Sequence, residues 1–390
     1  MTRMKMKGLL WAGSLLMLLA FASFVLCAEQ LPSGGEVVIG DITALSGGVA
    51  AMGVPWDKGA KLAAAEINSA GGLRISGKKY TLKIESYDDE ATPAKSVVGL
   101  RRFKQQYNIP VVLMALSGPT LAVLEINQSL GVLVITCATA PAITEMGNKL
   151  LLRPPQTGQE EVGKFARIAA DTLGKVEYAI MADVGEWGKY QESFFRKAMT
   201  ELGGKIVASE WFTEATQTDF YPQLTKIRGI NPKAIYLPAH DDPAILIVKQ
   251  ARELGIKVPF IFPMGAMTDK ARARIDPELI EGCYVGINRW DVKTEEPLRF
   301  GEKYIKKYGE TAATHSAMAW ECTWIVARAM EKAGTTTDAH KIREACLKVV
   351  PLPKHIGIVG QERFDPVTGQ GRWWRVLGLI KNGKVAEQRE

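Results

Sequence analysis

Strand-like apolar runs alternate with helix-length amphipathic segments along most of this 390-residue chain. The run 37–41 precedes the segment 56–70, which carries apolar residues at helical spacing and ends at Gly71-Gly72. Such alternation is typical of a parallel sheet with crossover helices, because each parallel connection must return to the same end of the sheet. The sequence therefore predicts an α/β protein.

The alternation runs through two cycles of similar order, which predicts two lobes of similar architecture. Strands are expected at 37–41, 80–85, 111–115 and 132–136 in the first cycle, and at 178–181, 205–211, 234–237 and 258–262 in the second. Arg153-Pro154-Pro155 separates the cycles as a stiff, non-helical crossing. Near the C-terminus, 373–380 alternates like a strand and Asn382-Gly383 is a hairpin signal.

The first 28 residues have the order of a secretory signal. Three basic residues within the first seven positions precede an apolar stretch over 9–26, and Cys27-Ala28 follows. Two alternatives stay open: an uncleaved membrane anchor, since about 18 apolar residues can span a bilayer, and a lipid attached to Cys27. We expect a cleaved signal peptide over residues 1–28 and a periplasmic location.

Export would place four further cysteines in an oxidising compartment: Cys137, Cys283, Cys322 and Cys346. Their irregular spacing predicts no pairing. Cys322, inside an apolar run, is interpreted either as a buried small hydrophobe or as one half of a Cys322–Cys346 bridge.

Composition and motifs argue against several function classes. The formal net charge of +7 includes three positive charges of the N-terminal segment. The sequence has no run of basic residues of the kind that binds nucleic acid. Common hydrolase, metalloprotease, redox and dinucleotide motifs are absent. A near match to a phosphate loop over 72–79 has Lys79 in place of Ser or Thr, so we interpret it as a turn. We expect no enzyme, no cofactor, no metal and no nucleic-acid partner.

A set of short motifs then occurs in a characteristic order. The set comprises Leu45-Ser46-Gly47, Glu66-Ile67-Asn68-Ser69-Ala70-Gly71-Gly72, Asp88-Asp89, Ala138-Thr139-Ala140-Pro141, Arg153, Thr218-Asp219-Phe220 and Gln250-Ala251-Arg252-Glu253-Leu254-Gly255. With these motifs the chain resembles the periplasmic solute-binding proteins of ABC importers, of the leucine/isoleucine/valine-binding (branched-chain amino acid) type.

The resemblance implies the type I periplasmic-binding-protein fold: two Rossmann-like lobes joined by a three-crossing hinge, with a ligand cleft between them. It implies a first lobe over 36–154 plus 290–356 and a second lobe over 155–289 plus 357–390. The second and third crossings are expected near 287–290 and 356–360.

Carried over position by position, the resemblance implies a ligand site at strand ends. Ser117 and Gly118 correspond to the loop that grips a carboxylate, and Cys137, Ala138 and Thr139 correspond to a second anchor. The local pattern agrees with the first assignment, because a loop between a strand and a helix offers free N–H groups and the helix dipole to an anion. The alternatives are an ordinary N-cap for Ser117 and a plain turn for Thr139.

From the facing lobe, the resemblance assigns Trp187 to an aromatic lid and His240 to a polar position across the cleft. Both stand in predicted strand-to-helix loops, where α/β clefts collect ligand groups. Packing is the alternative for Trp187. An ordinary loop role is the alternative for His240.

Two positions depart from the family pattern. Met52 stands where the amino-acid binders carry an aromatic residue, and Met264 stands where they carry the glutamate that pairs with the ligand's ammonium group. A methionine offers a soft apolar wall instead. An α-amino group would then need another acid, for which Asp241, Asp242 and Glu186 are the candidates.

We therefore expect an exported substrate-binding protein of an ABC importer. It would capture a hydrophobic or branched-chain amino acid, or a related small carboxylate, by lobe closure and deliver it to the permease subunits in the membrane. The alternatives are a binder of a non-amino aliphatic or aromatic carboxylate, and the ligand-sensing receptor of a signalling system.

Overall fold

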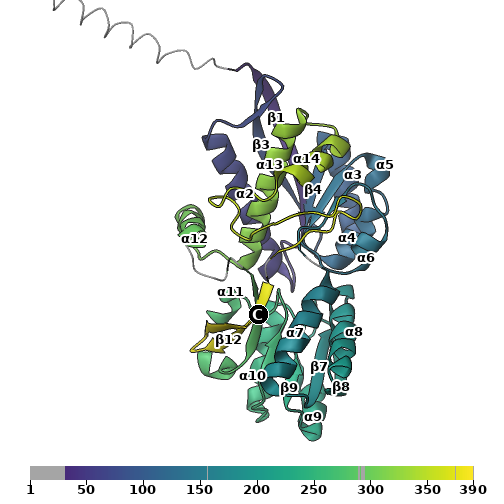
Figure 1. The fold of residues 1–390 in the computed structure, drawn as a ribbon, viewed down its shortest axis with the longest axis vertical. Helices are drawn as coiled ribbons and strands as arrows, with labels where there is room; N and C mark the ends of the chain where they lie inside the picture. The colour runs from purple at the N-terminus through teal and green to yellow at the C-terminus, as the bar shows by residue number, and fades with distance from the viewer. Residues whose placement is uncertain (1–30, 156, 289, 291–294, 374, 390) are drawn as a thin grey trace, which may run out of the picture.

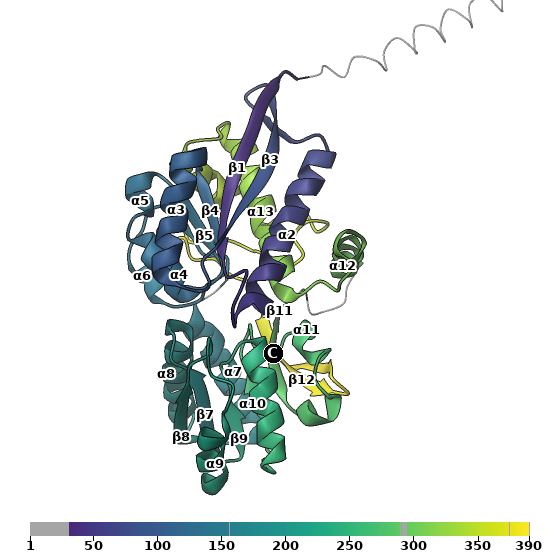
Figure 2. The same ribbon diagram turned by 180° about the vertical axis from the view of Figure 1, so that it is seen from behind.

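The computed structural model describes residues 31–155, 157–288, 290, 295–373 and 375–389. The expected signal peptide, including Cys27, lies outside these residues. Figures 1 and 2 show two α/β lobes stacked along the long axis of the molecule. Within the described residues, the helices are all too short or too polar to cross a bilayer.

The first lobe is built on a six-stranded sheet with the order β2-β3-β1-β4-β5-β6. All neighbouring strands are parallel except the β2–β3 pair. The strands are β1 (Ser33–Thr43), β2 (Leu73–Ile75), β3 (Lys78–Asp88), β4 (Val111–Met114), β5 (Leu133–Thr136) and β6 (Leu151–Leu152). The segment 72–79, which was interpreted as a turn, forms the short strand β2, a turn at 76–77 and the start of β3. The strand β2 was not expected.

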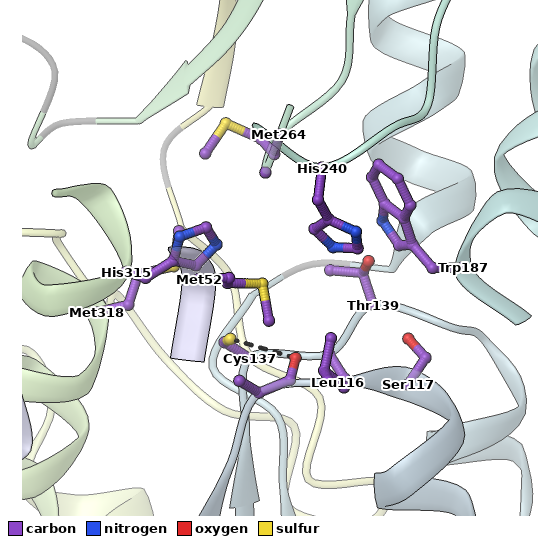
Figure 3. Close-up of a pocket in the computed structure, with 13 residues that line it drawn as sticks. Met52, Leu116, Ser117, Cys137, Thr139, Trp187, His240, Met264, His315 and Met318 are labelled. Carbon is purple, nitrogen blue, oxygen red and sulfur yellow. Dashed lines mark hydrogen bonds between the residues drawn. The ribbon is translucent and has the colours of Figure 1, made fainter. Parts of the chain in front are cut away.

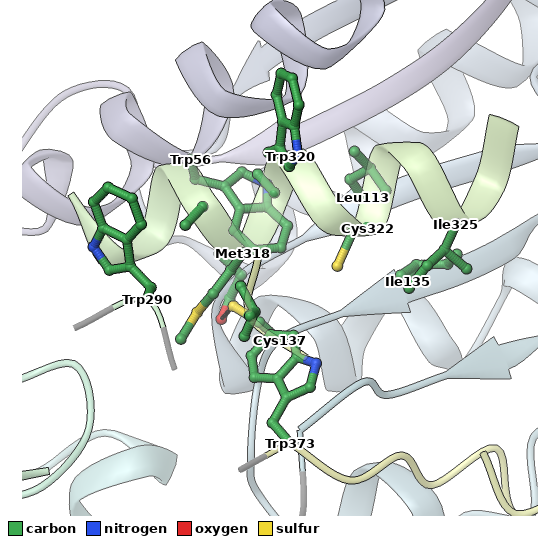
Figure 4. Close-up of a cluster of buried hydrophobic side chains, with 14 of the residues drawn as sticks. Trp56, Leu113, Ile135, Cys137, Trp290, Met318, Trp320, Cys322, Ile325 and Trp373 are labelled. Atoms are coloured by element: carbon green, nitrogen blue, oxygen red, sulfur yellow. Dashed lines mark hydrogen bonds between the residues drawn. The ribbon is translucent and has the colours of Figure 1, made fainter. Parts of the chain in front are cut away.

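Helices cover both faces of this sheet (Figures 1 and 2). They are α2 (Ala50–Ser69), α3 (Pro93–Tyr107), α4 (Ser117–Leu124), α5 (Asn127–Leu130), α6 (Ala142–Glu145), α12 (Glu295–Tyr308), α13 (Thr314–Ala333) and α14 (Ala339–Val349). α13 packs along α2 and is buried around most of its circumference. In Figure 4, Cys322 and Ile325 of this helix lie beside Leu113 and Ile135 of the sheet, whereas Trp320 points away from the sheet.

The second lobe is built on a seven-stranded sheet with the order β13-β12-β11-β10-β9-β7-β8. Its strands are β7 (Glu177–Asp183), β8 (Lys205–Phe212), β9 (Ala234–Tyr236), β10 (Phe260–Phe262), β11 (Tyr284–Asn288), β12 (Arg375–Lys381) and β13 (Lys384–Arg389). Its helices are α7 (Gly158–Leu173), α8 (Glu186–Glu201), α9 (Tyr221–Ile230), α10 (Asp241–Glu253), α11 (Asp269–Arg272) and the 3-10 turn η1 (Pro277–Ile280). Asn382 and Gly383 both take positive φ between the antiparallel strands β12 and β13, which confirms the expected hairpin.

The four cysteines of the described residues are all buried, and none of them forms a disulfide there. The alternative of a Cys322–Cys346 bridge was therefore wrong. Cys322 instead fills the core between α13 and the first sheet, and burial raises the pKa of its thiol well above the ordinary value.

The first passage between the lobes, at Arg153, lies beside the segment that leads to β12. The backbone N–H of Arg153 donates to the carbonyl of Gly369 at 2.9 Å, and its side-chain Nε donates to Oε1 of Gln370 at 2.8 Å. Burial lowers the pKa of Arg153 to about 10, so its guanidinium stays charged at neutral pH.

The last return to the second lobe comes later than the expected crossing near 356–360. The Glu321 carboxylate on α13 accepts the backbone N–H groups of Val359 at 2.5 Å, Gly360 at 3.1 Å and Gln361 at 2.6 Å. Residues 359–361 are thereby held against the first lobe, and the chain pairs with the second sheet only from Arg375. The apolar spacing of 356–359 could not reveal this, because the buried acceptor lies some 40 residues away.

We predict that Glu321→Gln lowers the free energy of unfolding by at least about 2 kcal/mol. Hydrogen bonds to a charged group contribute about 1.5–3 kcal/mol each, and the amide turns a donor toward N–H groups that are themselves donors. Urea unfolding followed by circular dichroism measures the loss. Glu302→Gln, the same change at an exposed position of α12, is the matched control. A Glu321→Gln protein within 0.5 kcal/mol (roughly the spread of harmless surface changes) of wild type would contradict the assignment.

Candidate functional site

A cavity lies between the two lobes (Figure 3). Its lining residues are Met52, Ala115, Leu116, Ser117, Cys137, Ala138, Thr139, Trp187, His240, Met264, Gly265, His315 and Met318. Most of them directly follow β4, β5, β9 or β10, because the carboxyl ends of parallel strands meet at one edge of each sheet. The cavity thus gathers residues from both lobes.

The structure brings eight of the nine expected site residues to this cavity. Gly118 is the exception, since it follows Ser117 on α4 without reaching the lining. Sequence reasoning missed five lining residues: Ala115, Leu116, Gly265, His315 and Met318. A polar His315 at the start of an otherwise apolar helix was the available signal for α13.

Ser117 stands at the first position of α4, directly after β4. The preceding residue, Leu116, provides no side-chain cap, so the backbone N–H groups of the first turn lack an acceptor within the helix. The Ser117 hydroxyl is buried and has no hydrogen-bond partner. A buried hydroxyl without a partner costs free energy, and a ligand acceptor would satisfy both this hydroxyl and the helix terminus.

The second expected anchor, after β5, is engaged within the protein. The Thr139 hydroxyl forms a hydrogen bond with the Tyr190 hydroxyl on α8, which belongs to the other lobe. The Thr139 carbonyl also accepts the backbone N–H of Gly158 at 2.9 Å. Cys137 Sγ contacts the carbonyl of Ala115 at 3.6 Å. In this conformation Thr139 links the lobes, and Ser117 offers the open hydroxyl.

On the facing wall, His240 is held by Glu214. The Nδ1 atom of His240 lies 2.6 Å from Oε2 of Glu214, and the other carboxylate oxygen accepts the backbone N–H of His240. The Trp187 ring packs against the imidazole, with ring centroids 4.6 Å apart and an angle of 31° between the ring planes. Burial lowers the pKa of His240, but the charge and hydrogen bond of Glu214 outweigh burial and raise the pKa above its ordinary value.

A second imidazole and three methionines complete the cavity wall. Burial, with the nearby His240 as a smaller cause, lowers the pKa of His315 to about 3, so this side chain is neutral. Figure 3 shows Met52, Met264 and Met318 around the cavity on the side of His315. The walls therefore combine apolar methionine side chains with polar groups from Ser117, Thr139 and the two histidines.

The three acids considered for a ligand ammonium group point elsewhere. The Asp241 carboxylate accepts the backbone N–H of Thr268 at 2.9 Å, Asp242 pairs with Arg274 at 2.6 Å, and Glu186 pairs with Lys189 at 3.0 Å. No Asp or Glu occurs among the described residues that line the cavity. Nor do the described residues bring three or more His, Cys, Asp or Glu side chains together in a way that would hold a metal ion.

Comparisons with known proteins agree with this architecture. Residues 36–370 match the family model described as periplasmic binding protein. An amino acid binding protein of Pseudomonas aeruginosa is 29% identical over 63% of this chain and 66% of its own length. The leucine-, isoleucine-, valine-, threonine- and alanine-binding protein of the same organism is 25% identical over 83% of this chain and 84% of its own length.

Among solved structures, the branched-chain amino acid transporter substrate-binding protein LivJ of Streptococcus pneumoniae, in complex with isoleucine, superimposes with a TM-score of 0.80. It is 26% identical, and the match covers 90% of this chain and 98% of that one. The two lobes, their sheets and the matched residues lead to one conclusion. This chain belongs to the periplasmic binding protein family and has the type I fold of that family.

Proposed function

We propose that this protein is an exported solute-binding protein that captures a small carboxylate with an apolar body and delivers it to the permease of an ABC importer. Branched-chain amino acids and related aliphatic acids form this ligand class. The observation that carries the proposal is the buried, unpartnered Ser117 hydroxyl at the N-terminus of α4, in a cavity that Met52, Met264 and Met318 also line. The relatives named above, which bind such amino acids, support the class.

A carboxylate suits the first-lobe wall for electrostatic reasons. The N-terminal end of α4 carries partial positive charge, and its backbone N–H groups act together with the Ser117 hydroxyl as donors. Two carboxylate oxygens offer enough acceptors for all of these groups. The apolar body of the ligand would then rest against Met264 and Met52.

Capture would proceed by closure of the lobes. Ser117 belongs to the first lobe, whereas Trp187, His240 and Met264 belong to the second. A ligand that contacts both walls stabilises the closed conformation by the free energy of the contacts made only there. The hydrogen bond between Thr139 and Tyr190 would add to closure without contacting the ligand.

We predict that Ser117→Ala weakens binding of a hydrophobic carboxylate by about 1.5–3 kcal/mol, since the lost hydrogen bond has a charged acceptor. Calorimetry with leucine and 4-methylpentanoate measures the change. The matched amide should bind poorly to wild type and lose less in the variant. Ser129→Ala, at an exposed position of α5, is the control. Equal affinities in wild type and Ser117→Ala would remove the hydroxyl from the site.

We further predict that saturating ligand changes the tryptophan fluorescence of the wild type and that Trp187→Phe abolishes most of this change. Trp187 lines the cavity and packs against His240, so ligand binding and lobe closure should alter its surroundings directly. Trp211→Phe on β8, whose side chain is exposed, serves as the control. A fluorescence change of full size in Trp187→Phe would show that the signal arises elsewhere.

A further inference from the structure

We propose that His240, oriented by Glu214, makes this cavity select acids that carry an oxygen acceptor beside the carboxylate, such as 2-oxo acids with apolar side chains, over the matching α-amino acids. The inference rests on the proposed function and names its substrate class. It follows from the charges and hydrogen-bond partners of the residues that line the cavity.

The orientation of His240 is determined by three contacts. One Glu214 oxygen forms a hydrogen bond with Nδ1, the other accepts the backbone N–H, and the Trp187 ring packs against the imidazole at a tilt. The described residues supply no partner for Nε2. Figure 3 shows the ring directed from the second lobe toward the wall that carries Leu116, Ser117 and Thr139. Nε2 is therefore the nitrogen available to a ligand.

The carboxylates around His240 favour a donor at Nε2. Those of Glu214, Asp183 and Asp241 raise the pKa of His240 and so favour the protonated imidazole, and neutral His315 lies nearby. With Nδ1–H directed to Glu214, the protonated ring presents Nε2–H to the cavity. This donor matches a ligand oxygen and opposes an ammonium group.

An ammonium group in the cavity would lack a carboxylate partner. The described lining contains no Asp or Glu, and the nearest acid of the wall, Glu214, already binds His240 through both oxygens. Neutral His315 supplies at most one acceptor. A buried cation without a compensating charge is costly, so the α-amino group is disfavoured relative to an oxygen at the same carbon.

The test is calorimetry on the full mature protein with three matched pairs: leucine, valine and phenylalanine, each against its 2-oxo acid. We expect every 2-oxo acid that binds to do so at least tenfold more tightly than its amino acid. Parity, or tighter binding of the amino acid in the tightest pair, would overturn the inference. That result would leave the proposed function standing. Absence of binding by all six would overturn both.

Substitutions of His240 test whether this residue causes the selectivity. His240→Leu should bring the two members of the tightest pair within about threefold of each other, while His240→Gln, which retains a donor, should keep part of the preference. His355→Gln, at an exposed histidine outside the cavity, should leave the ratio unchanged. An unchanged ratio in a folded His240→Leu protein would overturn the assignment.

The pH dependence of the wild type supplies a readout that needs no variant. Above the pKa of His240, Nε2 loses its proton and becomes an acceptor. Binding of the 2-oxo acid should therefore weaken as pH rises through that pKa, and binding of the amino acid should strengthen. Glu214→Gln should move this crossover to lower pH, because the charge that raises the pKa is removed. Parallel pH profiles for the two ligands would contradict the proposal.

Discussion

The hydrogen-bonded pairing of Arg153 with residues 369–371 holds two connections between the lobes side by side. The Arg153 backbone exchanges hydrogen bonds with Gly369 and Gly371, and its buried guanidinium donates to Gln370 and to the hydroxyl of Thr144. The carboxyl ends of the strands in the two sheets therefore face each other where the connecting segments pass between the lobes. A cavity between them can form only where the strands end, because the rest of each lobe is filled core.

The two walls of that cavity present different chemistry. The first lobe offers an unpartnered hydroxyl and the start of α4, which together suit an anion. The second lobe offers an imidazole held by a buried carboxylate and covered by an indole. In this arrangement the first lobe would bind the carboxylate that all ligands share. The second lobe would discriminate among ligands by the groups beside that carboxylate.

Sequence reasoning went furthest where local pattern decides structure. The alternation of apolar runs with amphipathic segments, together with turn residues, predicted the strands. Residues that follow those strands, including Ser117 and His240, line the cavity, as expected at the carboxyl ends of a parallel sheet. Tertiary contacts decided the rest. His315 and Met318 reach the cavity because α13 packs along α2. The last crossing comes later than expected because Glu321 binds N–H groups that are distant in sequence. Cys322 and Cys346 are both buried and do not form a disulfide. Apart from the polar His315 near the start of α13, these contacts have no local signature in the sequence.

The most direct test of the account is a crystal structure of the protein with 4-methyl-2-oxopentanoate bound. The account predicts a carboxylate oxygen within about 3 Å of the Ser117 hydroxyl and of the first N–H groups of α4. It also predicts the 2-oxo oxygen on Nε2 of His240 and the alkyl group against the methionine side chains. A ligand turned end for end, with its carboxylate on His240 and its alkyl group on Ser117, would contradict the central claim.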